Sequence, residues 1–453
     1  MQRRAVHRRR GRRAGAAAVA AALVLVALAA LPPAGGVRAL PSFARQTGLS
    51  CNTCHIVFPE LTPFGRDFKL RGYTMISGTQ GQTSHLEEGA FPPVSAMMQA
   101  SYTVLKEKVP GTQNGNALLP DELSLFYAGR VSHELGAFLQ VTYDGEDDHF
   151  TMDNADVRFA ETKTAHAHPL VYGLLMNNNP TVSDPWNSTP AWGFPYARAE
   201  LAPAPTAAAQ VDGVLAQRVA GLGACVSWRN LVYAEGDVYR TFAIGDVEPP
   251  AIDVGNLIAG VTPYWRLALY GQNGSRSWEA GTYGLRSRQH PAGDAATTRT
   301  DEFLDLALDG QFQWIAEKHQ VSVHATWIHE RRDWDASFPL GAVSRERDTL
   351  RTFRVDASWY FRRMLGVSVA RFSTTGDRDA LLHPAAPVEG SATGSPDSDG
   401  WILEGAWVPW YNTRLAVQYT RYTKFNGGRR DYDGFGRDAS DNDTLYFNIW
   451  IMF

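Results

Sequence analysis

The chain has 453 residues, of which 44% are apolar and 20% charged, and it contains 13 Trp, 17 Tyr and 21 Phe. The apolar fraction excludes a disordered chain, and three cysteines are too few for a disulfide framework. The formal charge of −4 is uneven, because residues 1–39 contain eight Arg and no acidic residue. The rest of the chain is therefore acidic and lacks the basic stripe that nucleic acid requires, so we expect no nucleic-acid partner.

Residues 1–39 have the pattern of a secretory signal peptide. Seven Arg precede an apolar stretch from Ala14 to Leu31, and Val37-Arg38-Ala39 provides a cleavage pattern ending at Ala39. The alternative is an uncleaved anchor helix, because 18 apolar residues are borderline for spanning a membrane. We favour the signal peptide, since the stretch is rich in Ala and ends in the cleavage pattern. The chain is therefore expected to be exported.

One segment, Cys51-Asn52-Thr53-Cys54-His55, has the C-x-x-C-H spacing of c-type haem attachment. Two thiols within one helical turn can form thioether bonds to the haem, and the adjacent imidazole can reach the iron as an axial ligand. The alternatives are a redox-active thiol pair or half of a zinc site. We favour one covalent haem c, because the remaining cysteine, Cys225, is distant and no βαβ pattern surrounds the pair. We expect Cys225 to be a buried free thiol.

A short helix is predicted directly after this motif. Thr62 is a suitable N-cap, Pro63 fits the first helical position and Gly72 fits the C-terminal stop. Phe64 and Phe68, four residues apart, share one face of that helix. We expect both rings to pack on the haem; ordinary packing against a neighbouring wall is the alternative.

Residues 40–92 are predicted to be a short, mainly helical haem c segment. A domain of this size is marginal without a cofactor or another staple, so the haem would serve as its core. Four residues are candidates for the second axial ligand of the iron: Met75, His85, Met97 and Met98. Met97 is preferred, because strand alternation points only one of the two adjacent methionines inward. The alternative is that both of them only pack.

From Val94 onward, short runs alternate apolar and polar residues between turns, as β-strands do. In the run 301–314, one face carries Leu304, Leu306, Leu308, Phe312 and Trp314, and the other carries Asp305, Asp309, Gln311 and Gln313. Buried carboxylates are costly in a packed core but suit a wet lumen. Sixteen such runs begin near residues 94, 122, 136, 152, 169, 219, 231, 263, 277, 301, 319, 349, 364, 399, 412 and 441.

The connections between these runs alternate in length. Long ones at about 107–121, 178–218, 242–262, 286–300, 331–348, 375–398 and 423–440 alternate with tight turns such as Arg229-Asn230 and Arg362-Arg363. This pattern, with the terminal aromatic Phe453, is typical of an outer-membrane barrel with long loops outside. We therefore expect an all-β fold over 93–453, a sixteen-stranded antiparallel outer-membrane β-barrel whose lumen the haem segment plugs. A soluble β-sandwich or propeller is the alternative.

The chain resembles the fused monohaem cytochrome–porin family of iron-oxidising outer-membrane cytochromes. The likeness is closest in three stretches, Pro41–His55, Phe58–Tyr73 and Asn177–Tyr196. The resemblance implies that an electron from extracellular Fe(II) passes through one haem c to a periplasmic c-type cytochrome. Cys51, Cys54 and His55 match the family's haem motif. No iron-binding residue can be carried over.

Three classes of function remain open on the sequence. The favoured one is an Fe(II):cytochrome c oxidoreductase in contact with outer-membrane lipid. An electron conduit with another donor or direction, and a diffusion porin with a haem-bearing plug, are the alternatives. We see no nucleophile–base constellation and expect no catalytic acid or base. The acidic stretches 144–148 and 431–443 offer oxygen ligands for Ca²⁺ or Fe²⁺, although solvated loop tips are the commoner explanation.

Overall fold

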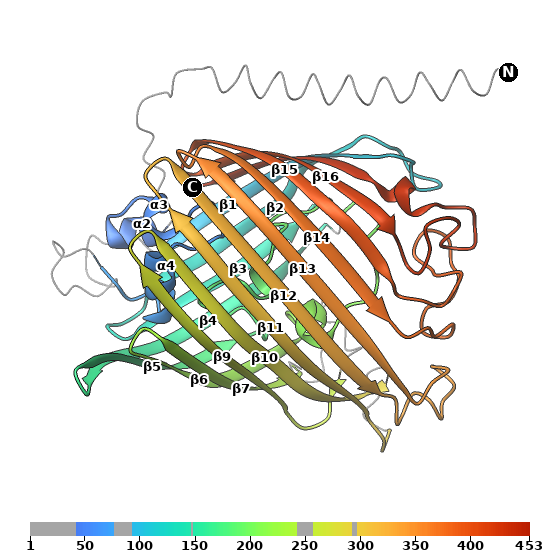
Figure 1. Ribbon diagram of the computed structural model, residues 1–453, viewed down its shortest axis with the longest axis horizontal. Coiled ribbons are helices and arrows are strands. Elements are labelled where there is room, and N and C mark those ends of the chain that lie inside the picture. Colours follow the sequence, from blue (N-terminus) through green and yellow to red (C-terminus); the bar gives the residue numbers. More distant parts are fainter. Residues whose placement is uncertain (1–41, 77–92, 146–147, 242–256, 292–296) are drawn as a thin grey trace.

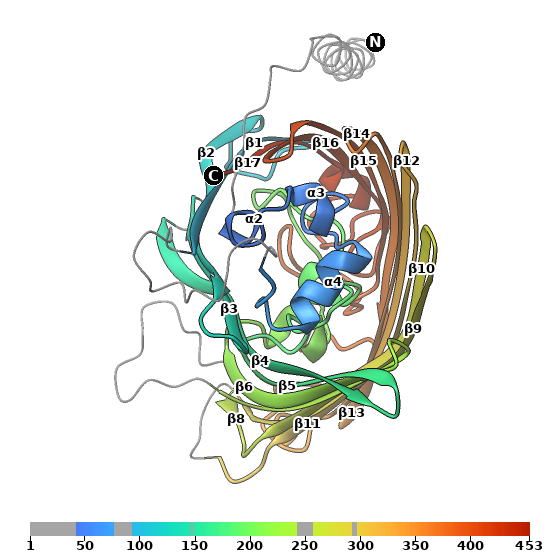
Figure 2. The same ribbon diagram turned by 90° about the vertical axis from the view of Figure 1, so that its left-hand side faces the viewer.

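The chain forms a closed antiparallel β-barrel with helices inside one end (Figures 1 and 2). The computed structural model describes residues 42–76, 93–145, 148–241, 257–291 and 297–453. In these ranges sixteen long strands pair in order around the barrel, and a two-residue strand, β8 (Leu257–Ile258), pairs with the end of β10. The long strands are β1 Val94–Leu105, β2 Asn116–Arg130, β3 Leu135–Asp144, β4 His149–Ala165, β5 His168–Asn177, β6 Val219–Trp228, β7 Val232–Thr241, β9 Thr262–Asn273, β10 Arg276–His290, β11 Asp301–Ile315, β12 His319–Asp333, β13 Arg347–Phe361, β14 Leu365–Gly376, β15 Ser398–Trp410, β16 Thr413–Lys424 and β17 Thr444–Met452.

Closure is made by the first and last strands. β1 and β17 pair over nine positions, and Met97 lies opposite Met452 in their register. Beyond that pair, the backbone groups of Ala96 and Phe453 exchange two hydrogen bonds, of 2.7 and 2.9 Å. Each long strand therefore has a partner on both sides, which a strand that crosses lipid requires because lipid offers no hydrogen bonds.

The sixteen strands predicted from alternation are confirmed, and so is the alternation of connection lengths. At one end the strands are joined by turns of two to four residues, at 131–134, 166–167, 229–231, 274–275, 316–318, 362–364 and 411–412. We call this the short-turn end; it carries the C-terminus (Figure 1). Except for the brief connection between β3 and β4, the connections at the opposite, long-loop end are longer.

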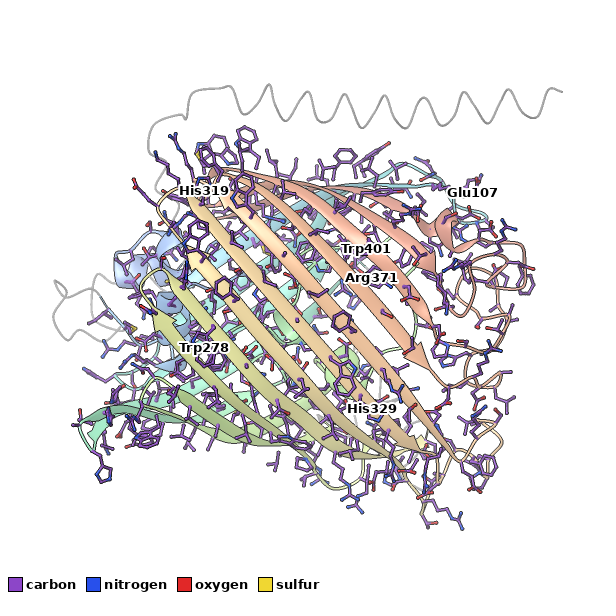
Figure 3. All side chains as sticks on the ribbon, viewed as in Figure 1. Glu107, Trp278, His319, His329, Arg371 and Trp401 are labelled. Atoms are coloured by element: carbon purple, nitrogen blue, oxygen red, sulfur yellow. The ribbon has the colours of Figure 1, made fainter. Side chains whose placement is uncertain are left out.

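The outer surface of the barrel is apolar. Between its ends, exposed side chains include Leu174, Leu222, Leu267, Leu306, Leu308 and Leu403. Near the short-turn end an aromatic belt is exposed, formed by Trp228, Trp278, Trp314, Trp359, Trp410 and Phe453. Trp401 and Phe150 are exposed within the first residues of β15 and β4, which begin at the long-loop end. Figure 3 labels Trp278 and Trp401. An apolar band between aromatic girdles is the surface of a barrel that spans a membrane. No described helix is long and apolar enough to cross a membrane.

Three short helices of the N-terminal segment lie inside the ring of strands: α2 (Ser42–Thr47), α3 (Cys51–Cys54) and α4 (Pro63–Leu70) (Figure 2). The predicted helix after the motif is confirmed, with Thr62 as its N-cap and Pro63 at its first turn. Gly72 follows with φ +68°, the left-handed conformation that glycine adopts at low cost. The predicted signal peptide and His85 lie outside the described residues.

The connection 178–218, which the sequence placed outside the barrel, instead folds into the lumen. It contains the short helices η1 (Pro190–Trp192) and η2 (Gln210–Val214). Its Asp184 is fully buried. Nη2 of Arg266, on β9, forms ion pairs with Oδ1 of Asp184, at 3.2 Å, and with Oδ2 of Asp309 on β11, at 2.7 Å. Removing one partner from a buried ion pair typically costs about 3–5 kcal/mol. The inward-facing charges of the wall therefore hold this connection inside.

The barrel topology is tested by cysteine labelling on whole cells. Ala385 is exposed in the connection 377–397 at the long-loop end, and Glu317 is exposed in a short turn. In an outer membrane with the expected orientation, a membrane-impermeant thiol reagent should label Ala385→Cys on intact cells and Glu317→Cys only after the membrane is breached. The opposite labelling pattern would reverse the orientation.

Candidate cofactor site

The C-x-x-C-H motif forms one turn of helix, α3, with His55 as its C-cap. The His55 amide donates a hydrogen bond to the Cys51 carbonyl, 2.9 Å away, and both motif cysteines are free thiols. Burial and the neighbouring Cys51 thiol raise the pKa of Cys54 to about 11. Burial lowers the pKa of His55 to about 4. Hydrogen bonds to the backbone of Pro59 and Glu60 act in the opposite direction and raise it in part. The imidazole is therefore neutral near pH 7, the form that coordinates a metal.

A single side chain, that of Thr62, ties the motif to α4. Its hydroxyl donates to the Thr53 carbonyl, at 2.6 Å, and accepts a hydrogen bond from the Gly65 amide, at 3.2 Å. The Thr62 amide also donates to the Cys54 carbonyl, at 2.8 Å. At Gly65 a Cβ atom would lie 2.2 Å from that same carbonyl oxygen. The close packing of α3 on α4 therefore requires glycine at this position.

Two buried cationic side chains anchor α4 in the lumen. Arg66 donates to the side-chain oxygens of Gln311 and Gln313, at 2.7 and 2.6 Å. Lys69 donates to three oxygens of the connection 178–218, the carbonyls of Val182 and Asp184 and the Asn187 side chain, at 2.7 to 3.0 Å. Since a buried cation without partners is costly, these contacts fix the position of the helix. They also fix the motif that is packed on it.

The motif borders a cavity at the short-turn end, which we call the motif cavity. It has a volume of about 1430 Å³, counted with its open mouth. Cys51, Cys54 and His55 line it together with α2, with Gly65, Phe68 and Lys69 of α4, and with the short-turn ends of β1–β3 and β15–β17. Most of the remaining lining is apolar, including Phe43, Phe68, Phe126, Phe138, Val408 and Trp450. A largely apolar cavity with a few placed polar groups is what a cofactor site requires.

Several buried donors at the motif cavity have no hydrogen-bond partner among the described residues. Arg414 is 5% exposed; one of its nitrogens donates to Glu404, while Nε and Nη1 have no partner. The indole nitrogen of Trp450 and Nδ1 of His55 are also buried without partners. Unpaired buried donors are rare and costly. Buried polar atoms without partners also occur elsewhere in the described barrel, for example Nε of Arg266, but those at the motif cavity fit an occupant that carries acceptor groups, such as the carboxylates of haem.

The other sequence-predicted site residues are placed differently. Phe68 lines the motif cavity, but Phe64, on the same helix, is not among its lining residues. Met97 is 2% exposed and points inward as alternation predicts, yet it lines a different cavity. Neither Met75 nor Met98 lines the motif cavity. Of the two aromatic residues and the preferred methionine, the structure brings only Phe68 together with the motif.

Met97 belongs to a second cavity, the polar cavity, which has a volume of about 2220 Å³ when its open mouth is included. It extends from Asp144 and His149, at the long-loop ends of β3 and β4, to Trp450 near the short-turn end. Five carboxylates line it, with two guanidinium groups: Asp121, Glu122, Asp144, Asp153 and Glu200, against Arg198 and Arg218. The two cavities share a wall formed by Phe58, Pro59, Phe126, Phe138, Trp192 and Trp450.

Carboxylates of the acidic stretch 431–443 accept hydrogen bonds from backbone amides of their own connection and of the connection 377–397. Asp433 accepts hydrogen bonds from the amides of Val388, Phe435 and Arg437, at 2.8 to 3.1 Å. Asp438 and Asp441 form a capping box around η5 (Ala439–Asn442). Within the described ranges, no group of three or more His, Cys, Asp or Glu side chains is arranged to hold a metal ion. Cys225 is buried and free, as predicted.

No protein-family model and no curated protein matches the chain. Solved structures of bacterial outer-membrane proteins are similar to 80% of it. The channel DcaP of Acinetobacter baumannii shares 11% identity over 96% of its own chain, with a TM-score of 0.46. Salmonella typhi OmpF, in a complex with daunomycin, shares 10% over 97%, with a TM-score of 0.43. A loop-deletion mutant of Vibrio cholerae OmpT shares 8% over 98%, with a TM-score of 0.42.

The packing of the motif on α4 is tested by Gly65→Ala. The added methyl group collides with the Cys54 carbonyl, and overpacking of this kind typically costs about 1–3 kcal/mol. We expect faster protease cleavage within 42–76 in the folded barrel. The matched control is Gly236→Ala on β7, where an added Cβ meets nothing within 4 Å. Equal protection of both variants would show that the close approach is not needed.

Proposed function

We propose that the protein carries electrons across the outer membrane, from extracellular Fe(II) through one covalent haem c to a periplasmic c-type cytochrome. One observation carries the proposal: a C-x-x-C-H turn borders an apolar cavity in which buried donors, above all those of Arg414, lack partners. A diffusion pore needs none of these features.

Residues of the motif cavity fit the requirements of haem attachment. Cys51 and Cys54 would hold the haem through two thiols of one helical turn, and His55 would offer the iron a neutral imidazole. Arg414 and Trp450 would donate to haem carboxylates, while Phe43 and Phe68 exclude water. A bound haem would supply a one-electron couple, which matches the single electron released when Fe(II) becomes Fe(III).

The two cavities supply a path between the two sides of the membrane. The acidic lining of the polar cavity attracts divalent cations from the long-loop end, since a lumen lined mostly by one sign of charge concentrates counter-ions. The motif cavity lies at the opposite, short-turn end, where a periplasmic partner would dock. The apolar band of a membrane barrel is about 25 Å tall, so a haem held inside shortens the electron transfer.

Two alternatives share parts of this architecture. An electron conduit with another donor or direction would use the same cysteines and cavity. A diffusion porin is favoured by one observation, the large polar cavity in the lumen. The burial of α4 and of the connection 178–218 within the barrel opposes free diffusion. We therefore rank the porin below both electron-transfer readings.

Covalent attachment is tested on purified protein. Haem should stay with the wild-type chain after denaturation and extraction with acidified organic solvent, because thioether bonds survive both. Cys51→Ser/Cys54→Ser should retain none, and His55→Ala should alter the absorption spectrum. Cys225→Ser is the matched control and should keep its haem, since Cys225 lies outside the motif cavity. Extraction of haem from the wild type would contradict the proposal.

The donor is tested by stopped-flow absorption in proteoliposomes, with Fe²⁺ added only at the long-loop side. We expect prompt haem reduction, slowed by a chelator and by high ionic strength, which screens the acidic cavity. Cys51→Ser/Cys54→Ser protein should give no signal. Reduction only by a donor at the short-turn side would favour the other conduit. Rapid solute swelling matching an open pore would favour the porin.

A further inference from the structure

The motif cavity contains one soft donor that the N-terminal segment does not supply. Met452, the last residue of β17, lines this cavity together with His55. It lies opposite Met97 in the register of β1 and β17, so both side chains face the lumen. The two methionines nevertheless border different cavities, Met97 the polar cavity and Met452 the motif cavity.

Four other polar side chains of the motif cavity, those of Lys69, Tyr73, Asn187 and Asn412, are already engaged. The Lys69 amine donates to three oxygens, at 2.7 to 3.0 Å, and the Tyr73 hydroxyl donates to Asp156, at 2.6 Å. The amide of Asn187 bonds the Pro59 carbonyl, and that of Asn412 bonds the Met452 carbonyl, at 3.0 and 2.9 Å. Using any of them as an iron ligand would break contacts that hold the lumen together. The Met452 thioether has no such structural task.

The backbone of Met452 is fixed while its side chain remains half-buried. Its amide donates to the Asn412 carbonyl, at 2.8 Å, and its carbonyl accepts from the Asn412 side chain. The thioether packs in the cluster that contains Phe58 and Trp450. Phe58 contacts both the His55 ring and the Trp450 ring, with centroids 5.0 and 5.3 Å apart. A flexible, polarisable side chain held at this rim can adapt to a ligand in the cavity.

We propose that Met452, on the barrel wall, is the second axial ligand of the haem that the N-terminal segment carries; the inference rests on the proposed function. His55 would supply the first ligand and β17 the second, so haem binding would join the segment to the closing strand of the barrel. Methionine ligation raises a haem potential relative to histidine ligation. Met97, which the sequence favoured, would then only pack.

The test is absorption spectroscopy and redox titration of purified, haem-loaded barrels. Oxidised wild type should show the sulfur-to-iron charge-transfer band in the far red, and Met452→Leu should lose it while retaining covalent haem. Met452→His should instead give a bis-imidazole spectrum and a lowered reduction potential. Met97→Leu is the matched control, because it changes the facing methionine, and it should leave both band and potential unchanged.

The outcomes separate the inference from the function it depends on. A band retained in Met452→Leu, or lost equally in Met97→Leu, would overturn Met452 as the ligand. A bis-imidazole spectrum of the wild type would overturn it as well. If Met452→Leu does not assemble, Met452→His decides, since an unchanged potential there contradicts ligation. Absence of covalent haem in the wild type would instead remove the proposed function.

Discussion

Lipid offers no hydrogen bonds, so a protein that crosses it with strands must close its sheet. Here the closing contact is the pairing of β1 with β17, strands separated by almost the whole described chain. Because successive side chains of a strand face opposite sides, an apolar exterior sends the other half of every strand's side chains inward. That half includes Arg158, Arg266 and Glu330, all nearly or fully buried. Each needs a partner inside the barrel.

Polar and charged contacts with the wall hold the lumen segments in addition to apolar packing. Arg266 forms an ion pair with Asp184 of the connection 178–218. Glu330 accepts a hydrogen bond from the backbone amide of Gln210, at 2.7 Å. Conversely, Arg66 of α4 donates hydrogen bonds to the side-chain oxygens of Gln311 and Gln313 in the barrel wall. Polar matching is directional, so it fixes orientation as well as depth. The position of the motif follows from that of α4. The Thr62 hydrogen bonds join α3 to α4, and the absence of a side chain at Gly65 lets the two helices pack closely.

Features encoded by neighbouring residues, namely the strands and α4, could be predicted from the sequence. Contacts between residues that are distant in the sequence could not. Strict alternation revealed the strands, and Thr62-Pro63 with Gly72 revealed α4, because these signals lie within a few residues of each other. The predicted run near 122 missed the start of β2 at Asn116, since Pro120 interrupts the alternation there. The connection 178–218 was misplaced because its Asp, Ser and Asn residues have the composition of an exposed loop. Their partners, such as Arg266, are distant in sequence.

Dependence on residues distant in the sequence also explains why the cavity that Met97 borders and the role of Arg414 were not predicted. The alternation of side chains along β1 predicted that Met97 points inward. The cavity that it borders depends on Phe58 and on the opposite strand, β17. Arg414 was missed, although a signal existed: it lies at an inward-facing position of β16, where a buried cation needs acceptor groups. Only its neighbours determine that Glu404 satisfies one of its nitrogens and leaves two without partners.

The contrast between the two cavities bears directly on the proposed electron path. A divalent cation in the polar cavity would keep its water and polar neighbours, whereas entry into the apolar motif cavity would remove that water at large cost. An electron carries no hydration shell and can cross a wall one side chain thick. Phe58 and Trp450, packed edge to face, form part of that wall and border both cavities. Under the proposed function, iron would approach and leave on the long-loop side, and only its electron would pass this aromatic pair.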